Sequence, residues 1–220
     1  AADPGTQCLK EHPEMLLLTE DETPEYITWW DSYYLSPVNP ATKAYTQNLV
    51  HRFLDTWGFD GLKIDGQHLN CCMPDWNEAS GLDYPHQSQE QLPGFFQVIY
   101  DTARALKPTA VVQICPCGCA VNYFLLPTFN QAVASDPMSS LQIRMKRKAY
   151  AAMAPQLAYY GDHIELSDGG DDYGTQIGIG AVIGTKFTYP KDNPNASASF
   201  LLTPEKEQLI RKWMAIYKEH

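Results

Sequence analysis

Apolar side chains recur at helical spacing in four stretches of the chain. The first covers residues 40–57, and its apolar positions share one helix face: Tyr45, Leu49, Phe53 and Trp57. Asn39 followed by proline is a strong helix start, and Gly58 is the residue type expected just past a helix end. The other three predicted helices cover residues 95–106, 140–153 and 204–217.

Short apolar runs separate these helices and predict strands. They cover residues 59–65, 110–114, 131–135, 157–160 and 181–187. Strands that alternate with helices favour parallel βα units and an α/β fold. Two regions stand outside this pattern. Residues 1–38 show no clear periodicity, and residues 66–88 form a long polar loop of a kind that is usually functional.

Polar residues follow the predicted strands at their carboxyl ends. Asp65, Cys115, Asp136 and Asp162 occupy these positions, one for each strand. Ligands of parallel α/β proteins bind at this end of the sheet. Several polar residues at successive strand ends are hard to explain by packing, so the sequence predicts a binding or active site there.

The strand that ends at Asp65 carries a second polar residue, Lys63. Alternation along a strand directs these two side chains to one face and Leu62 and Ile64 to the other. A lysine and an aspartate suit a pocket at the mouth of a sheet. The alternative is a buried Lys63–Asp65 ion pair that only supports the fold, and this strand alone gives the two interpretations equal weight. The acids at the other strand ends favour the active site.

Paired carboxylates are the groups that glycoside hydrolysis requires, one to attack the anomeric carbon and one to protonate the leaving oxygen. Lys63 would keep the carboxylate of Asp65 ionised, as a nucleophile needs. Asp136 has no cation beside it on its strand and could retain a proton as the acid. Arg144 could reach ligand hydroxyls or either carboxylate, and the spacing leaves both open.

Composition narrows the classes of partner. The chain has 220 residues, of which 44% are hydrophobic and 12% aromatic, as expected for a globular domain with a substantial core. A net charge of −10 gives no electrostatic footprint for nucleic acid or an anionic membrane. No apolar run reaches the ~18 residues of a membrane span. No signal peptide is visible, so a secreted or periplasmic location stays open.

The sequence gives little reason to expect a metal or a cofactor. Its six cysteines are clustered, which fits free thiols near a pocket better than a disulfide scaffold or a zinc site. Residues 168–172 lack the spacing of a calcium loop, and residues 178–184 lack the dinucleotide fingerprint.

Three further residues are candidates for substrate binding. Trp29 and Trp30 lie in an aromatic cluster, for which core packing is the commoner fate and stacking on a sugar ring is the functional alternative. His68 lies in the polar loop, three residues beyond Asp65.

Several of these segments resemble one known family. Residues 62–65 look like the K-x-D nucleophile strand of glycoside hydrolase family 36 and its clan, the retaining α-galactosidases and raffinose-synthase-like proteins. Residues 134–136, followed by residues 142–144, resemble the acid/base segment of this clan. The resemblance extends to three other segments, which are residues 39–42, 115–119 and 175–190.

The resemblance implies a (β/α)8 TIM-type barrel in which Asp65 is the nucleophile and Asp136 the acid/base. It also implies a covalent glycosyl–enzyme intermediate, retention at the anomeric carbon, and a position for the cysteine-rich strand end near the sugar hydroxyls. Three departures bear on the preference for galactose. The family commonly has Trp at Ile64 and Asn at Gln67, and a glycine-rich segment where residues 116–119 stand.

A closed barrel has eight βα units and typically ~250 residues, whereas this chain has about five units. We therefore expect residues 1–220 to be a single catalytic-domain fragment, an incomplete barrel with strands four to eight of a longer enzyme. A second copy, or the missing N-terminal part, would cover the open sheet edge.

The function expected is that of a retaining, α-galactosidase-like hydrolase acting on a small oligosaccharide or galactoside. The alternatives are a raffinose-synthase-like transglycosidase and a truncated, non-catalytic sugar-binding domain. A Cys/His metal protein ranks behind these.

Overall fold

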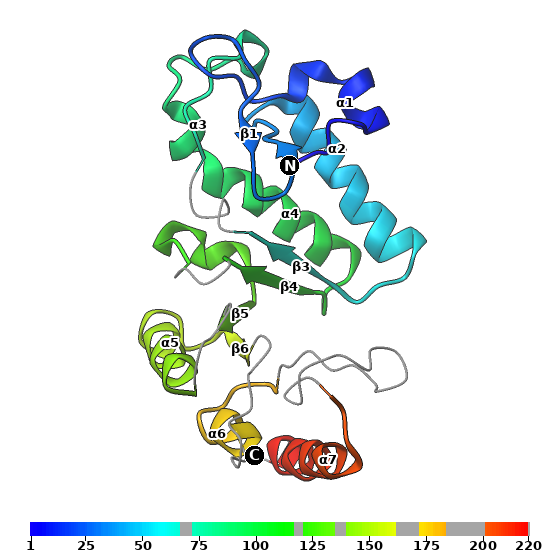
Figure 1. Ribbon diagram of the computed structural model, residues 1–220, viewed down its shortest axis with the longest axis vertical. Coiled ribbons are helices and arrows are strands. Elements are labelled where there is room, and N and C mark those ends of the chain that lie inside the picture. The colour runs from blue at the N-terminus through cyan, green and yellow to red at the C-terminus, as the bar shows by residue number, and fades with distance from the viewer. Residues whose placement is uncertain (67–71, 117–120, 135–139, 162–171, 184–200, 220) are drawn as a thin grey trace. The chain divides into compact units, whose positions relative to one another are not determined.

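The structure is a computed structural model that describes most of the chain in six ranges (Figure 1): residues 1–66, 72–116, 121–134, 140–161, 172–183 and 201–219. The chain forms two compact units. Unit 1 comprises Ala1–Leu62, His68–Val112 and Asn122–Thr128, and unit 2 comprises Lys63–Gln67, Gln113–Val121 and Phe129–His220. The expectation that residues 1–220 are one catalytic-domain fragment stays a prediction.

Two long helices form the centre of unit 1. Helix α2 (Pro40–His51) continues through a π-helical turn, Arg52–Thr56, and packs against α4 (Leu92–Leu106), as Figure 1 shows. The buried side chains on these helices include Val50, Leu54, Phe96, Ile99 and Ala103. Gly58 follows with φ +74°, in the left-handed region that favours glycine. The predicted helix over residues 40–57 and its glycine stop are confirmed.

The N-terminal segment of unit 1 is built from short elements. Helix α1 (Gln7–Glu11) and the 3-10 turn η1 (Pro13–Met15) lead to the antiparallel pair β1 (Tyr26–Ile27) and β2 (Ser32–Tyr33). Elements of two to five residues are too short to produce a periodic apolar pattern. This is why the sequence predicts nothing definite here.

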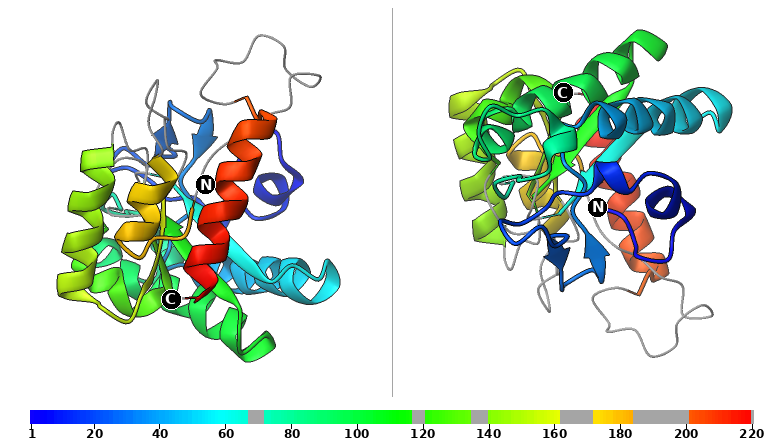
Figure 2. Two further views of the ribbon diagram at one scale, coloured as in Figure 1. Left: turned by 90° about the horizontal axis from the view of Figure 1, so that it is seen from below. Right: turned by 90° about the horizontal axis from the view of Figure 1, so that it is seen from above.

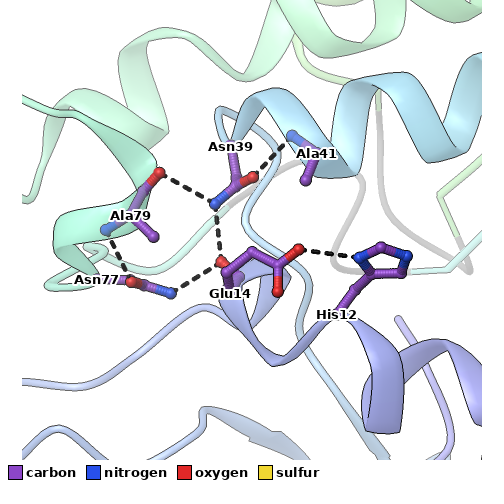
Figure 3. Close-up of polar contacts among 6 residues, drawn as sticks. All are labelled: His12, Glu14, Asn39, Ala41, Asn77 and Ala79. Atoms are coloured by element: carbon purple, nitrogen blue, oxygen red, sulfur yellow. Dashed lines mark hydrogen bonds and ion pairs between the residues drawn. The ribbon is translucent and has the colours of Figure 1, made fainter.

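A polar network holds the N-terminal segment against the start of α2 (Figure 3). The side-chain oxygen of Asn39 accepts a hydrogen bond from the N–H of Ala41 at 2.8 Å and so caps α2. The Asn39 amide donates to the carbonyls of Glu14, at 2.7 Å, and Ala79, at 3.2 Å. One buried asparagine thereby joins three segments that lie far apart in the sequence.

The described part of the predicted polar loop is ordered by a buried carboxylate. Asp75 is 2% exposed and accepts hydrogen bonds from the N–H groups of Leu18 and Asn77 and from the Ser80 hydroxyl, at 2.6 Å. The loop also contains η4 (Glu78–Ser80) and α3 (Gln87–Glu90). Residues 67–71 of the predicted loop lie outside the described residues.

A four-stranded sheet runs in the order β3-β4-β5-β6. Its strands are β3 (Gly61–Asp65), β4 (Val111–Cys115), β5 (Gln131–Ala134) and β6 (Ala158–Gly161). β4, β5 and β6 pair in parallel, and a parallel bridge from Tyr160 to Val182 extends the order. The first four predicted strands and the α/β class are confirmed. Residues 184–187 of the fifth strand lie outside the described residues.

Unit 2 places three helices side by side, as the left view of Figure 2 shows: α5 (Ser140–Met153), α6 (Asp172–Gly178) and α7 (Pro204–Glu219). The predicted α5 and α7 are confirmed, whereas α6 was not predicted. Gly174 of α6 lies against the Trp213 ring, because a Cβ at Gly174 would come within 2.7 Å of that ring. Among the described helices, none is long and apolar enough to cross a membrane.

Replacing Gly61 tests how closely β3 approaches β4. A Cβ at Gly61 would collide with the carbonyl oxygen of Val111, so Gly61→Ala forces a backbone shift. We expect a loss of about 1–3 kcal/mol in the free energy of unfolding, measured by urea denaturation. Gly94→Ala is the matched control, because a Cβ at Gly94 in α4 meets nothing within 4 Å. An equal effect of the two substitutions would contradict the close approach.

Replacing Asn39 tests the network of Figure 3. Asn39→Ala removes the cap of α2 and the amide that donates to the carbonyls of Glu14 and Ala79, of which Glu14 keeps a second donor, Asn77. We expect a loss of about 2–3 kcal/mol in the free energy of unfolding. Gln47→Ala, at an exposed position of the same helix, should change it by less than about 0.5 kcal/mol. A similarly small loss for Asn39→Ala would show that the network does not stabilise unit 1.

Candidate functional site

Two backbone hydrogen bonds fix the register between β3 and β4. The N–H of Val111 donates to the carbonyl of Asp60 at 3.1 Å, and the N–H of Gly66 donates to the carbonyl of Cys115 at 3.0 Å. In a parallel pair of strands, the N–H of a residue donates to the carbonyl of the residue just before its partner, and its carbonyl accepts from the residue just after that partner. The first bond therefore pairs Gly61 with Val111, and the second pairs Asp65 with Cys115. Lys63 then lies beside Gln113.

This register gathers polar side chains on one face of the sheet. Because side chains alternate along a strand, Lys63 and Asp65 share a face with Gln113 and Cys115. Gln131 of β5 pairs with Gln113 and extends this face. We call these five residues the polar face. Lys63 and Asp65 are exposed, so the alternative of a fully buried ion pair does not describe them.

The opposite face of the sheet is apolar and covered. Ile114, Ala132 and Tyr159 follow one another across the strands, and each is no more than 1% exposed. The Tyr159 ring lies 5.7 Å from that of Tyr150 in α5, and its hydroxyl donates to the carbonyl of Ile143 at 3.2 Å. Helix α5 therefore covers this face, and the polar face lies on the other side of the sheet.

Two glutamines form a hydrogen-bonded pair within the polar face. Gln113 is 7% exposed, and its amide donates to the side-chain oxygen of Gln131. A buried amide is stable only with such a partner, so the interior of this face is built to hold polar groups. These two glutamines were not among the predicted site residues. The sequence feature that could have identified them is Gln113, the single polar residue in the apolar run of residues 111–115.

Cys115 lies at the carboxyl end of β4, beside Asp65 in the register. It is buried, with 1% of its surface exposed. On the opposite, covered face, burial raises the pKa of the Tyr150 phenol in α5 to about 12. That phenol therefore stays neutral at physiological pH.

Three of the predicted site residues lie outside the described residues: His68, Asp136 and Asp162. The strands that lead to the two aspartates are described. β5 ends at Ala134 and β6 at Gly161, in the same sheet as β3 and with β4, β5 and β6 parallel. The topology thus brings the carboxyl ends of β3, β5 and β6 to the same edge of one sheet.

The remaining candidates are on other elements. Arg144 is exposed on α5, the helix that follows β5. Trp29 and Trp30 lie on the β1–β2 hairpin of unit 1, where their side chains are 88% and 40% exposed. Core packing, the commoner fate of tryptophan, therefore does not apply to Trp29.

Two other kinds of candidate site, a metal cluster and an apolar groove in unit 2, provide no groups for catalysis in the described part of the chain. Within the described ranges, no three His, Cys, Asp or Glu side chains converge as metal ligands would. The groove lies between α6 and α7, and its lining consists of apolar, aromatic and glycine residues such as Ile177, Trp213 and Ile216. It offers no carboxylate, thiol or imidazole for chemistry.

Sequence comparison finds one class of relative. No family model matches the chain. The chain is 29% identical over 184 residues to an A type blood α-D-galactosamine galactosaminidase from Flavonifractor plautii. This match covers 79% of the chain and 16% of the relative.

Comparison with solved structures finds glycosidases. A family 36 α-galactosidase from Geobacillus stearothermophilus, in complex with 1-deoxygalactonojirimycin, matches 99% of the chain at a TM-score of 0.64 and 14% identity. An α-amylase from Lactobacillus plantarum matches 98% at 0.61 and 12% identity. An α-L-fucosidase from Paenibacillus thiaminolyticus matches 96% at 0.54 and 15% identity.

The chain spans only part of each of these proteins, with 29%, 57% and 35% of the three solved chains covered. The resemblance to the family 36 catalytic barrel is confirmed at the level of the fold, as is the partial match to a TIM-type barrel. The chain therefore has the parallel α/β fold of part of a glycosidase barrel, and it is related to glycoside hydrolases.

Proposed function

We propose that the polar face carries the active site of a retaining, α-galactosidase-like glycosidase, with Asp65 as nucleophile and Asp136 as acid/base. The observation that supports this most strongly is the register of β3 and β4. It sets Asp65 beside Cys115 and on the same face as Lys63, at the end of the sheet where barrel enzymes bind their substrates.

The chemistry proceeds in two displacements. A carboxylate oxygen of Asp65 attacks the anomeric carbon while the bond to the leaving-group oxygen breaks, and Asp136 donates its proton to that oxygen. Water then attacks the same carbon, Asp136 takes up the proton, and the bond to Asp65 breaks. Two inversions give net retention. Lys63 lies two residues before the nucleophile, on the same face of the strand.

The other candidates would bind the sugar. Cys115 adjoins Asp65 in the register, which supports assigning its thiol a contact with a hydroxyl of the sugar. We assign hydroxyl contacts also to His68, Arg144 and Asp162. The charged groups among these form the stronger hydrogen bonds, and they would fix the orientation of the ring.

A galactose-configured sugar is the proposed substrate. The structural relative was solved with 1-deoxygalactonojirimycin, and the sequence relative is named for α-D-galactosamine. The second of these names favours a second candidate, an α-linked galactosamine residue. Ile64 and Gln67 replace residues common in the α-galactosidases, which is consistent with an altered sugar preference.

Replacing Asp65 tests the proposal. With an aryl α-galactoside and the matching aryl α-galactosaminide, Asp65→Ala should lower kcat by about 10³-fold or more. Added azide should restore turnover and give the β-galactosyl azide, because azide attacks the face from which Asp65 attacked. Asp60→Ala is the matched control, since the Asp60 side chain is 99% exposed just before the same strand.

The outcome separates the alternatives. Equal turnover by the two variants would contradict the assignment of Asp65. A parent chain that binds the galactoside without turnover would identify a non-catalytic sugar-binding domain. Transfer to an added acceptor sugar in preference to water would identify a transglycosidase.

A further inference from the structure

The β1–β2 hairpin of unit 1 presents aromatic side chains to solvent. Trp29 at its tip is 88% exposed, and Trp30 and Tyr26 are each 40% exposed. Folded proteins rarely leave so much of a tryptophan in water, and exposed apolar surfaces of this kind mark binding sites. None of the chemistry assigned to Asp65 explains this feature.

The hairpin holds its tip in a fixed conformation. The N–H of Trp30 donates to the carbonyl of Ile27 at 3.1 Å, and the Ser32 hydroxyl donates to the carbonyl of Trp30 at 2.9 Å. Asp31 adopts φ +48°, a left-handed conformation that aspartate tolerates better than most residues. Tyr33 pairs with Ala2 through two bonds of 2.9 Å. A ligand that stacks on Trp29 would therefore pay little entropy to order the loop.

Hydrogen-bonding groups adjoin the rings. The Tyr26 hydroxyl donates to the carboxylate of Asp31, and this bond raises the pKa of Tyr26. A carboxylate can accept several hydrogen bonds, so Asp31 has capacity left for a ligand hydroxyl. A flat ring with acceptor oxygens beside it matches a sugar, which has an apolar C–H face and a rim of hydroxyls. Asp31 and the net charge of −10 oppose an anionic ligand.

We propose that Trp29 is a stacking platform for a neutral sugar unit of a glycan, with Asp31 accepting hydrogen bonds from its hydroxyls. This assignment rests on the proposed function and extends it.

Binding of raffinose, an α-galactosyl trisaccharide, tests the platform by calorimetric titration. Every variant carries Asp65→Ala so that the sugar is not consumed. Adding Trp29→Ala should raise the Kd about tenfold, and adding Trp29→Phe, which keeps an aromatic face, should raise it much less. Trp57→Ala is the matched control, because Trp57 is a 57% exposed tryptophan outside the hairpin and should leave the Kd unchanged.

Several results would overturn the platform. These are an unchanged Kd for Trp29→Ala, an equal loss for Trp57→Ala, and no binding of raffinose to the background protein. A shift from dimer to monomer in Trp29→Ala, without a change in sugar affinity, would show that a second copy of the chain covers the indole instead. An unchanged Kd together with turnover that depends on Asp65 overturns the platform alone and leaves the proposed function standing.

Discussion

The parallel pairing of β3 with β4 is the constraint on which the candidate site depends. Side chains alternate strictly along a strand, so a slip of one residue would turn Lys63 and Asp65 to the covered face and Leu62 and Ile64 to the polar face. The hydrogen bond from Gly66 to Cys115 fixes one end of the pairing. At the other end, Gly61 allows the two backbones to approach more closely than a Cβ would permit. The chemistry at the strand ends follows from this register.

The periodic elements were predictable because a long amphipathic segment shows its helical spacing of apolar residues within its own sequence. The helix over residues 40–57 showed a cap and a glycine stop in the sequence, and both are present in the structure. Its predicted buried face was wrong at Trp57, which is 57% exposed, and the structure buries Val50 and Leu54 instead. Helix α6 was not predictable in this way, because it has seven residues, including two glycines. The hairpin and the buried Asp75 network depend on contacts between segments that are distant in sequence, and no local pattern reports such contacts.

The candidate site was predictable in part. Alternation alone placed Lys63 and Asp65 on one face, and the strand-end rule identified Cys115. The pairing of Gln113 with Gln131 was not predicted, because it depends on a register between strands that a single sequence does not specify. The exposure of Trp29 could not be predicted from the sequence either, since tryptophan side chains are more often buried than exposed. The predicted cover of the open sheet edge, by a second copy or a further part of the chain, stays a prediction.

The central claim is that Asp65 forms a covalent bond to the sugar, and labelling by a slow-turnover fluorosugar tests it most directly. An α-galactosyl fluoride with a second fluorine on the ring would react through attack of an Asp65 oxygen on the anomeric carbon, with loss of fluoride. Peptide mapping by mass spectrometry should then find one sugar per chain, attached to the peptide that contains Asp65. A label on another carboxylate, or no label under conditions where the parent chain turns over an α-galactoside, would contradict the assignment.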